Sequence, residues 1–164
     1  MNDSKFYRLA EAALHIESKR LCDFTDSLDK DPGEKKNRIA DYKCAKYRYA
    51  SVSEIHSALY NNNLCRKAHN LKYSHHLLLP FDEIFTRNAA HLALYESAPE
   101  EEQPDYSLYY GMVAFADEQI EKYESKIAEA TDWERIELTE RIGGLHFAKE
   151  CLSEAWKKRK DAAL

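Results

Sequence analysis

The sequence predicts an all-α protein, an elongated bundle of about five to six helices. Glycine and proline, which favour turns, number only four each among 164 residues, too few for an all-β chain. Apolar residues make up 44 % of the chain and recur every three or four positions over long stretches, as in amphipathic helices. The length suits one folding unit, so we expect residues 1–164 to form a single all-helical domain.

Two helices are expected at the N-terminus, paired as a hairpin over about residues 4–62. In the first, apolar residues recur at seven-residue intervals from Tyr7 to Leu28. The sequence DKDPG (residues 29–33) then predicts a turn, because proline and glycine both interrupt a helix.

The second helix of this hairpin is expected from about residue 34 to 60. Ser51 starts the sequence SVSE, which has the spacing of a capping box and could divide this helix in two. The three asparagines 61–63 are expected to end it, since asparagine tolerates the left-handed conformation that follows a helix.

Two middle helices are expected over residues 64–97. The first would end before Pro80, and the second would begin at Asp82, a good N-cap residue. Residues 98–105 (APEEEQPD) contain two prolines and three consecutive glutamates, which predicts an acidic loop.

A long antiparallel helical hairpin is expected over residues 105–160. The apolar positions of its first helix alternate spacings of four and three. TDWE (residues 131–134) has the pattern of a capping box and predicts that the second helix starts almost at once. Gly143 and Gly144 lie inside that helix, where they favour a kink or the close approach of another backbone.

Several features favour a cytoplasmic protein that does not enter a membrane. The longest apolar run, LLLPF, is far shorter than the ~20 residues of a membrane span. The N-terminus lacks the apolar core of a signal peptide. The four cysteines are widely spaced without a CxxC motif, so we expect reduced thiols.

Charge is divided unevenly along the chain. Residues 34–76 hold nine basic and three acidic side chains, a net +6, whereas residues 82–140 hold four and sixteen, a net −12. This division predicts charge pairing within the molecule, a polarised surface, or both.

The acidic half suggests a non-enzymatic protein-binding module. Rows of carboxylates on helices can occupy the basic groove of another protein, so we expect an accessory or inhibitor protein that docks on a nucleic-acid-handling enzyme or complex. The second face of the C-terminal hairpin also makes a homodimer an alternative. The candidate partner-binding residues are Glu101, Asp117, Glu118, Glu121, Glu134 and Glu137.

The segment DYKCAKYRYAS (residues 41–51) supports an alternative function, nucleic-acid binding by the basic and aromatic region 35–76. Bases attract phosphates, and tyrosine rings can stack on nucleobases. The candidate residues are Lys43, Lys46, Tyr47 and Arg48.

CRKAHNLKYSHH (residues 65–76) raises a second alternative, a metal-binding bundle. On a helix Cys65, His69 and His76 share one stripe, and a Cys and a His four residues apart can chelate zinc. Lys72 lies in the same stripe and would repel the ion, so we expect neither a metal nor another cofactor.

A third alternative is a ribonuclease similar to the helical HEPN family, which uses an Arg and a His a few residues apart. The chain contains RIGGLH (Arg141 to His146) and RLAEAALH (Arg8 to His15). Such pairs are expected by chance at this composition, and RIGGLH lacks the polar residue that usually follows the Arg. With no Gly-rich phosphate loop or nucleophile elbow in the sequence, we expect no enzymatic activity.

Overall fold

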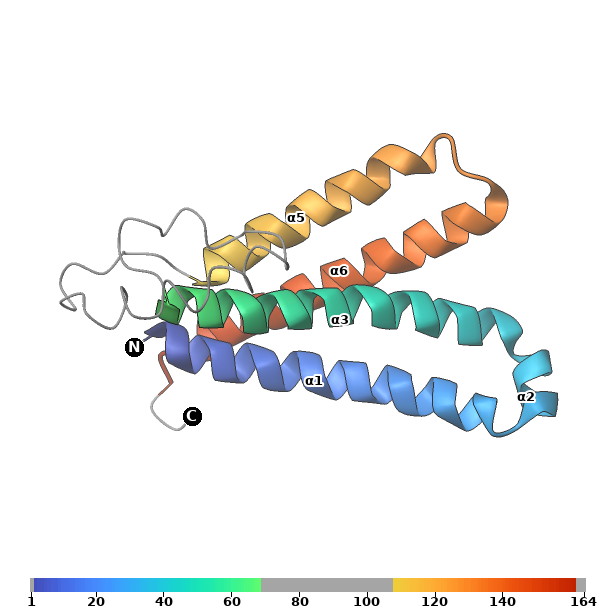
Figure 1. Ribbon diagram of the computed structural model, residues 1–164, viewed down its shortest axis with the longest axis horizontal. Coiled ribbons are helices and arrows are strands. Elements are labelled where there is room, and N and C mark those ends of the chain that lie inside the picture. The colour runs from blue at the N-terminus through green and yellow to red at the C-terminus, as the bar shows by residue number, and fades with distance from the viewer. Residues whose placement is uncertain (1, 69–107, 162–164) are drawn as a thin grey trace.

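The computed structural model describes the backbone of residues 2–68 and 108–161, and the side chains of residues 5–63 and 108–161. Within these ranges all regular structure is helical, and the predicted all-α bundle is confirmed (Figure 1). The helices are α1 (Asn2–Asp29), α2 (Pro32–Asn37), α3 (Ile39–Ala68), α5 (Leu108–Ile127) and α6 (Asp132–Lys158).

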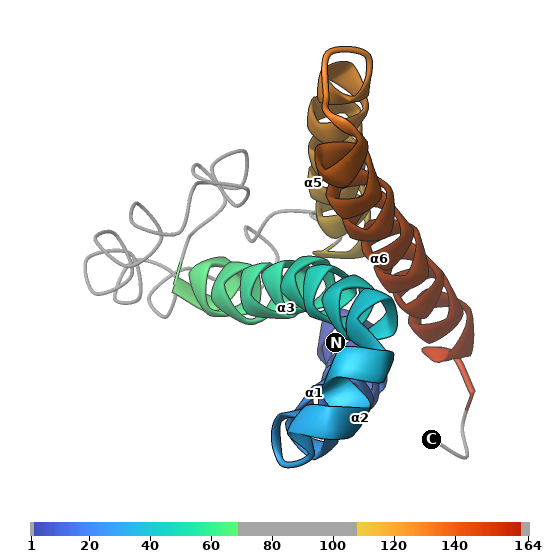
Figure 2. The same ribbon diagram turned by 90° about the vertical axis from the view of Figure 1, so that its right-hand side faces the viewer.

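The helices are arranged as two antiparallel pairs. α1 lies beside α3, α5 lies beside α6, and α6 also packs against both α1 and α3. Both views show that the two pairs meet near the chain termini and separate at the opposite end (Figures 1 and 2). The turn between α5 and α6 therefore lies away from α2 and the start of α3.

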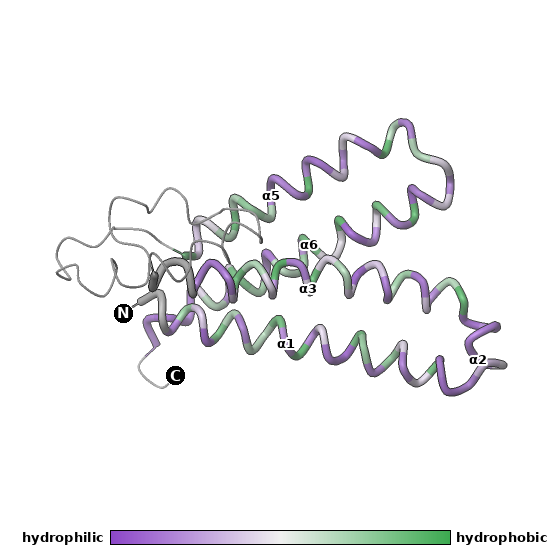
Figure 3. The backbone as a smooth tube through the Cα atoms, in the orientation of Figure 1, coloured by the Kyte–Doolittle hydropathy of each residue, from purple (hydrophilic) through white to green (hydrophobic). Residues whose placement is uncertain are grey.

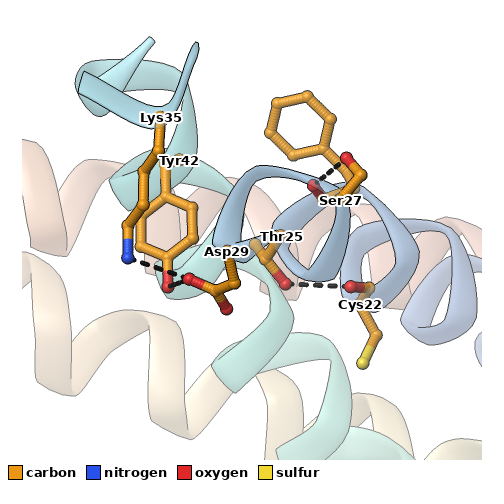
Figure 4. Close-up of polar contacts among 7 residues, drawn as sticks. Cys22, Thr25, Ser27, Asp29, Lys35 and Tyr42 are labelled. Carbon is orange, nitrogen blue, oxygen red and sulfur yellow. Dashed lines mark hydrogen bonds and ion pairs between the residues drawn. The ribbon is translucent and has the colours of Figure 1, made fainter. Parts of the chain in front are cut away.

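The turn after α1 occurs where DKDPG predicted it, but the expected start of the second helix at about residue 34 is wrong, because Pro32–Asn37 form the separate helix α2 and α3 begins at Ile39. Pro32 is the first residue of α2, where the missing N–H of proline has no cost, and the Asp31 side chain accepts a hydrogen bond from the Glu34 N–H at 3.1 Å. Figure 4 shows Asp29 accepting hydrogen bonds from Lys35 and from the Tyr42 hydroxyl, both at 2.8 Å. These two donors lower the pKa of the Asp29 carboxyl.

α3 is one continuous helix, so the expected stop at residues 61–63 is wrong and Ser51 does not divide the helix. Ser51 is fully buried in the middle of α3. The Asn61 and Asn62 side-chain amides donate to the carbonyl oxygens of Ser57 and Ala58, at 2.9 and 2.8 Å. Burial and these bonds to the preceding turn keep the asparagines within the helix.

The expected middle helices fall largely outside the described residues. Residues 64–68 continue α3 instead of starting a new helix. The remaining predicted helical residues up to 97, and the acidic loop 98–105, lie in the part of the chain that is not described.

The start of α6 confirms the capping box predicted from TDWE. The Thr131 N–H donates to the Glu134 carboxylate at 2.8 Å, and the Glu134 N–H donates to the Thr131 hydroxyl at 3.4 Å. These reciprocal bonds satisfy two donors that the first turn of a helix leaves free.

One hydrophobic core joins the four long helices. Its largest fully buried side chains are Phe6, Leu14, Val52, Ile55, Leu59, Leu108, Met112, Leu145 and Leu152. At the end of the bundle near the chain termini, the Phe6 ring meets Tyr109 and Trp156 edge to face, with centroids 5.6 and 5.8 Å away. These aromatic contacts bind the beginning of α1 to α5 and α6.

Hydrophobic and hydrophilic residues alternate along each long helix, as expected when one face packs and the other meets water (Figure 3). Among the described helices, none combines the length and the apolar character required to cross a lipid bilayer.

Candidate functional site

The acidic arm, residues 117–140, is the strongest candidate for a functional surface. It comprises the second half of α5, the turn that follows, and the beginning of α6, at the end where the helix pairs separate (Figure 1). Nine carboxylate side chains against three basic ones give it a net charge of −6. Ile120 is its one buried residue, so nearly all of the arm is accessible.

Some of the predicted carboxylates already have partners within the molecule. Asp117 forms an ion pair with Lys149 at 2.5 Å, and Glu137 pairs with Arg141 at 3.0 Å. The Glu134 carboxylate accepts the hydrogen bond of the capping box. These three residues stabilise the arm as well as contributing to its negative field.

Glu118 and Glu121 are the predicted carboxylates most available to a partner. Both are exposed on α5, and neither forms an ion pair with another described residue. Glu101, the remaining predicted partner-binding residue, lies outside the described residues.

The side chains of the basic segment 34–76 are described up to residue 63, and in this part they form no ion pair with the acidic arm. Lys35 and Arg38 instead pair with Asp29 and Asp41, close to them in sequence. The described structure therefore favours a polarised surface over charge pairing within the molecule.

The predicted nucleic-acid residues do not form one continuous basic face. Lys43 lies 4.6 Å from the centre of the Trp133 ring, and Lys46 lies 5.4 Å from that of Tyr42. Arg48 points elsewhere on α3, with its guanidinium 5.8 Å from the Phe147 ring. Tyr47 is half-buried, and its ring is 6.0 Å from the guanidinium of Arg141. The contact between Lys46 and Tyr42 lies within α3, whereas the other three join α3 to α6.

A polar cluster that the sequence did not reveal links α3, α5 and α6. The Tyr123 hydroxyl donates to the Glu54 carboxylate at 3.4 Å. Burial raises the pKa of Glu54, although this hydrogen bond and the charges of Lys122 and Arg141 act in the opposite direction. The sequence does not bring this cluster together, because Glu54 belongs to α3, Lys122 and Tyr123 to α5, and Arg141 to α6.

A cleft of about 630 Å³ lies between α5 and α6 beside this cluster. Its charged lining residues are Lys122, Lys126, Glu129, Glu134, Glu137 and Arg141. Positive and negative side chains are equal in number, and Glu137 and Arg141 already pair with each other. The cleft therefore favours no ligand of a particular charge.

The predicted metal stripe of Cys65, His69 and His76 lies outside the described side chains. Elsewhere, the His15 and His56 rings are 6.1 Å apart, and His56 Nε2 is 3.2 Å from the Glu11 carboxylate. In the described part of the chain, no group of three or more metal-ligating side chains has an arrangement that could hold an ion.

The candidate ribonuclease pair Arg141 and His146 is not brought together by the helix. Five residues in an α-helix correspond to a rotation of about 140°, so the two side chains leave α6 in different directions. Arg141 is paired with Glu137, while His146 is exposed. Arg8 and His15, the other pair, are both exposed on α1.

Two large apolar residues of α6 are exposed on the acidic arm. The side chains of Trp133 and Ile136 are 64 % and 42 % exposed, although their spacing resembles that of the core residues further along the helix. Tyr49 of α3 is also exposed, at 37 %. Trp133 was not among the candidate residues predicted from the sequence. Tryptophan side chains are among the most frequent energetic anchors of protein interfaces.

Neither a protein-family model, nor a characterised protein, nor a solved structure matches this chain.

Proposed function

We propose that the protein is a non-enzymatic binding module that docks on a basic protein surface through its acidic arm. The observation that supports this proposal is that the arm projects from the bundle with a net charge of −6 and without ion pairs to α2 or α3 among the described residues. A surface of one sign attracts a partner of the opposite sign and orients it before contact.

The partner is proposed to be a nucleic-acid-handling enzyme or complex, with this chain as its accessory or inhibitor protein. Proteins that bind nucleic acid expose rows of lysine and arginine to the phosphates. Exposed carboxylates on a helix, such as those of Glu118 and Glu121, can bind these lysines and arginines in place of the phosphates. A homodimer through the arm would place two surfaces of equal sign together, so a basic partner is favoured over a second copy.

The cytoplasm is the proposed compartment. Cys22, Cys44 and Cys151 are free thiols in the structure. Free thiols persist where the glutathione pool is reducing.

Affinity purification from a cell lysate, at low and at moderate salt, tests the proposed function. The test variant is Glu118→Lys with Glu121→Lys. The matched control is Glu34→Lys with Glu150→Lys, which changes the net charge equally at exposed residues outside the arm. We expect a nucleic-acid-handling protein to be captured by the wild type and the control, to be lost with the arm variant, and to bind less at the higher salt concentration.

Other outcomes would reject the proposal. Capture of nucleic acid alone would favour the basic region instead, and equal loss of the partner with both double variants would show that the arm has no special role. Capture of no protein would also contradict the proposed function.

A further inference from the structure

The exposed residue Trp133 lies on the face of α6 that α3 covers further along the helix, and Ile136 lies beside it, about 60° around the helix axis. Gly144 follows Trp133 by eleven residues, about three turns, so the two residues lie on the same face to within roughly 20°. At Gly144 the backbones of α6 and α3 are in contact, since an added Cβ atom would lie 2.9 Å from the Arg48 carbonyl oxygen.

Towards the acidic arm this face loses its cover. Both views show α3 and α6 diverging from their crossing towards the start of each helix (Figures 1 and 2). The Lys43 ammonium still reaches the Trp133 ring, at 4.6 Å from its centre. This long side chain is a partial substitute for the helix backbone that covers the same face at Gly144.

Carboxylates flank the uncovered apolar pair. Glu137 and Glu140 follow Trp133 and Ile136 by one turn, and Asp132 precedes them. Asp132 is exposed, while Glu137 and Glu140 are half-buried. The face thus combines an apolar centre with a margin of carboxylates, of which Glu137 already pairs with Arg141, and one cation, Lys43, lies over the Trp133 ring. The arm as a whole has a net negative charge.

We propose that this face of α6, centred on Trp133 and Ile136, is the docking surface for an amphipathic basic helix of a partner protein. The apolar stripe of that helix covers the two side chains, and its lysines and arginines contact the neighbouring carboxylates. A helix is the fitting occupant because α3 covers the same face of α6 in this way at Gly144. This inference rests on the proposed function and specifies which part of the acidic arm provides apolar contact.

Synthetic peptides provide a direct test. The probe is an amphipathic helical peptide of lysine and leucine, and its control is a lysine and serine peptide of the same length and charge. Trp133 and Trp156 are the two tryptophans of the chain, so a Trp156→Phe variant leaves Trp133 as the one fluorophore of its kind. We expect the leucine peptide to shift the Trp133 emission to shorter wavelength and protect it from acrylamide, and the serine peptide to do neither.

Calorimetric titration of the otherwise unaltered chain avoids dependence on the folding of the Trp156 variant. We expect Trp133→Ala with Ile136→Ser to weaken binding of the leucine peptide by about tenfold or more, as for an interface anchor. The matched control is Ile16→Ser, because Ile16 is 67 % exposed on α1, away from the arm. Its expected effect is less than twofold, and circular dichroism establishes that each variant remains helical.

The outcomes separate this inference from the proposed function. If Trp133→Ala with Ile136→Ser binds the leucine peptide as tightly as the wild type, or if Ile16→Ser loses binding to the same extent, the docking surface is rejected. The proposed function then stands or falls separately on the capture experiment with Glu118→Lys and Glu121→Lys, which leaves both apolar residues unaltered.

Discussion

A Cβ atom on Gly144 would lie 2.9 Å from the carbonyl oxygen of Arg48 and 3.0 Å from Cβ of Ser51, so α6 and α3 are in backbone contact at this residue. The contact explains why a glycine lies in the middle of a helix, where it would otherwise be unfavourable. It also fixes the point from which the acidic arm diverges from α3.

The first prediction concerns the two adjacent glycines. Gly144→Ala should lower the free energy of unfolding by about 1–3 kcal/mol, because rigid backbone atoms of α3 must move. Gly143→Ala is the matched control, since an added Cβ there has no neighbour within 4 Å. That variant should gain up to about 1 kcal/mol from the higher helix propensity of alanine. Urea denaturation measures both, and equal effects at the two residues would refute the close packing.

Phe6 should contribute strongly to stability. Its side chain is fully buried and contacts the Tyr109 and Trp156 rings. Phe6→Ala is expected to lower the free energy of unfolding by about 3–5 kcal/mol, whereas Phe6→Leu should cost less because it leaves a smaller cavity. A loss below about 1 kcal/mol for Phe6→Ala, measured by urea denaturation, would show that α1 does not depend on this aromatic cluster.

Glu54 should make stability depend on pH above its ordinary pKa of 4.5. Burial raises the pKa of Glu54, so the folded state binds the proton more tightly than the unfolded chain does. The stabilisation that comes from this tighter proton binding is therefore complete below pH 4.5, and it is lost as the pH rises through the folded-state pKa of Glu54. Glu54→Gln should remove the loss and leave the protein at least as stable as the wild type at neutral pH.

Tyr123→Phe tests the same cluster from its other side. The Tyr123 hydrogen bond lowers the pKa of Glu54, so its removal should extend the loss of stability to higher pH. Denaturant titrations across this pH range measure both variants. An unchanged pH profile in Glu54→Gln would show that other groups determine the pH dependence.

Cys151 should be a slow-reacting thiol. Burial, and then the negative charges of Glu17 and Glu150, raise its pKa from 9.0 to about 11. The reactive thiolate is thus scarce at neutral pH, and iodoacetamide should modify Cys151 more slowly than a cysteine in an unfolded peptide. Its contribution to stability is complete below about pH 9 and is lost as the pH rises towards about 11. Peptide mapping after timed alkylation measures the rate, and modification as fast as in the peptide would contradict its burial.

Local signals in the sequence determined much of the helical structure. The capping box at Thr131 and the turn before Pro32 lie where they were predicted, because a cap and a turn depend on residues three or four positions apart. The same reasoning failed at residues 61–63. Asparagine often ends a helix when it meets water, but burial of all three side chains against the bundle removes that alternative.

The sequence by itself therefore determined that this protein is a helical bundle with separated basic and acidic halves. Both properties follow from the order of residues along the chain, through helical periodicity and local charge. The tertiary structure alone decided the exposure of Trp133 and the meeting of Glu54 with Tyr123. Each depends on where helices cross and diverge, and that geometry is set by packing between residues remote in sequence, such as Gly144 against Arg48.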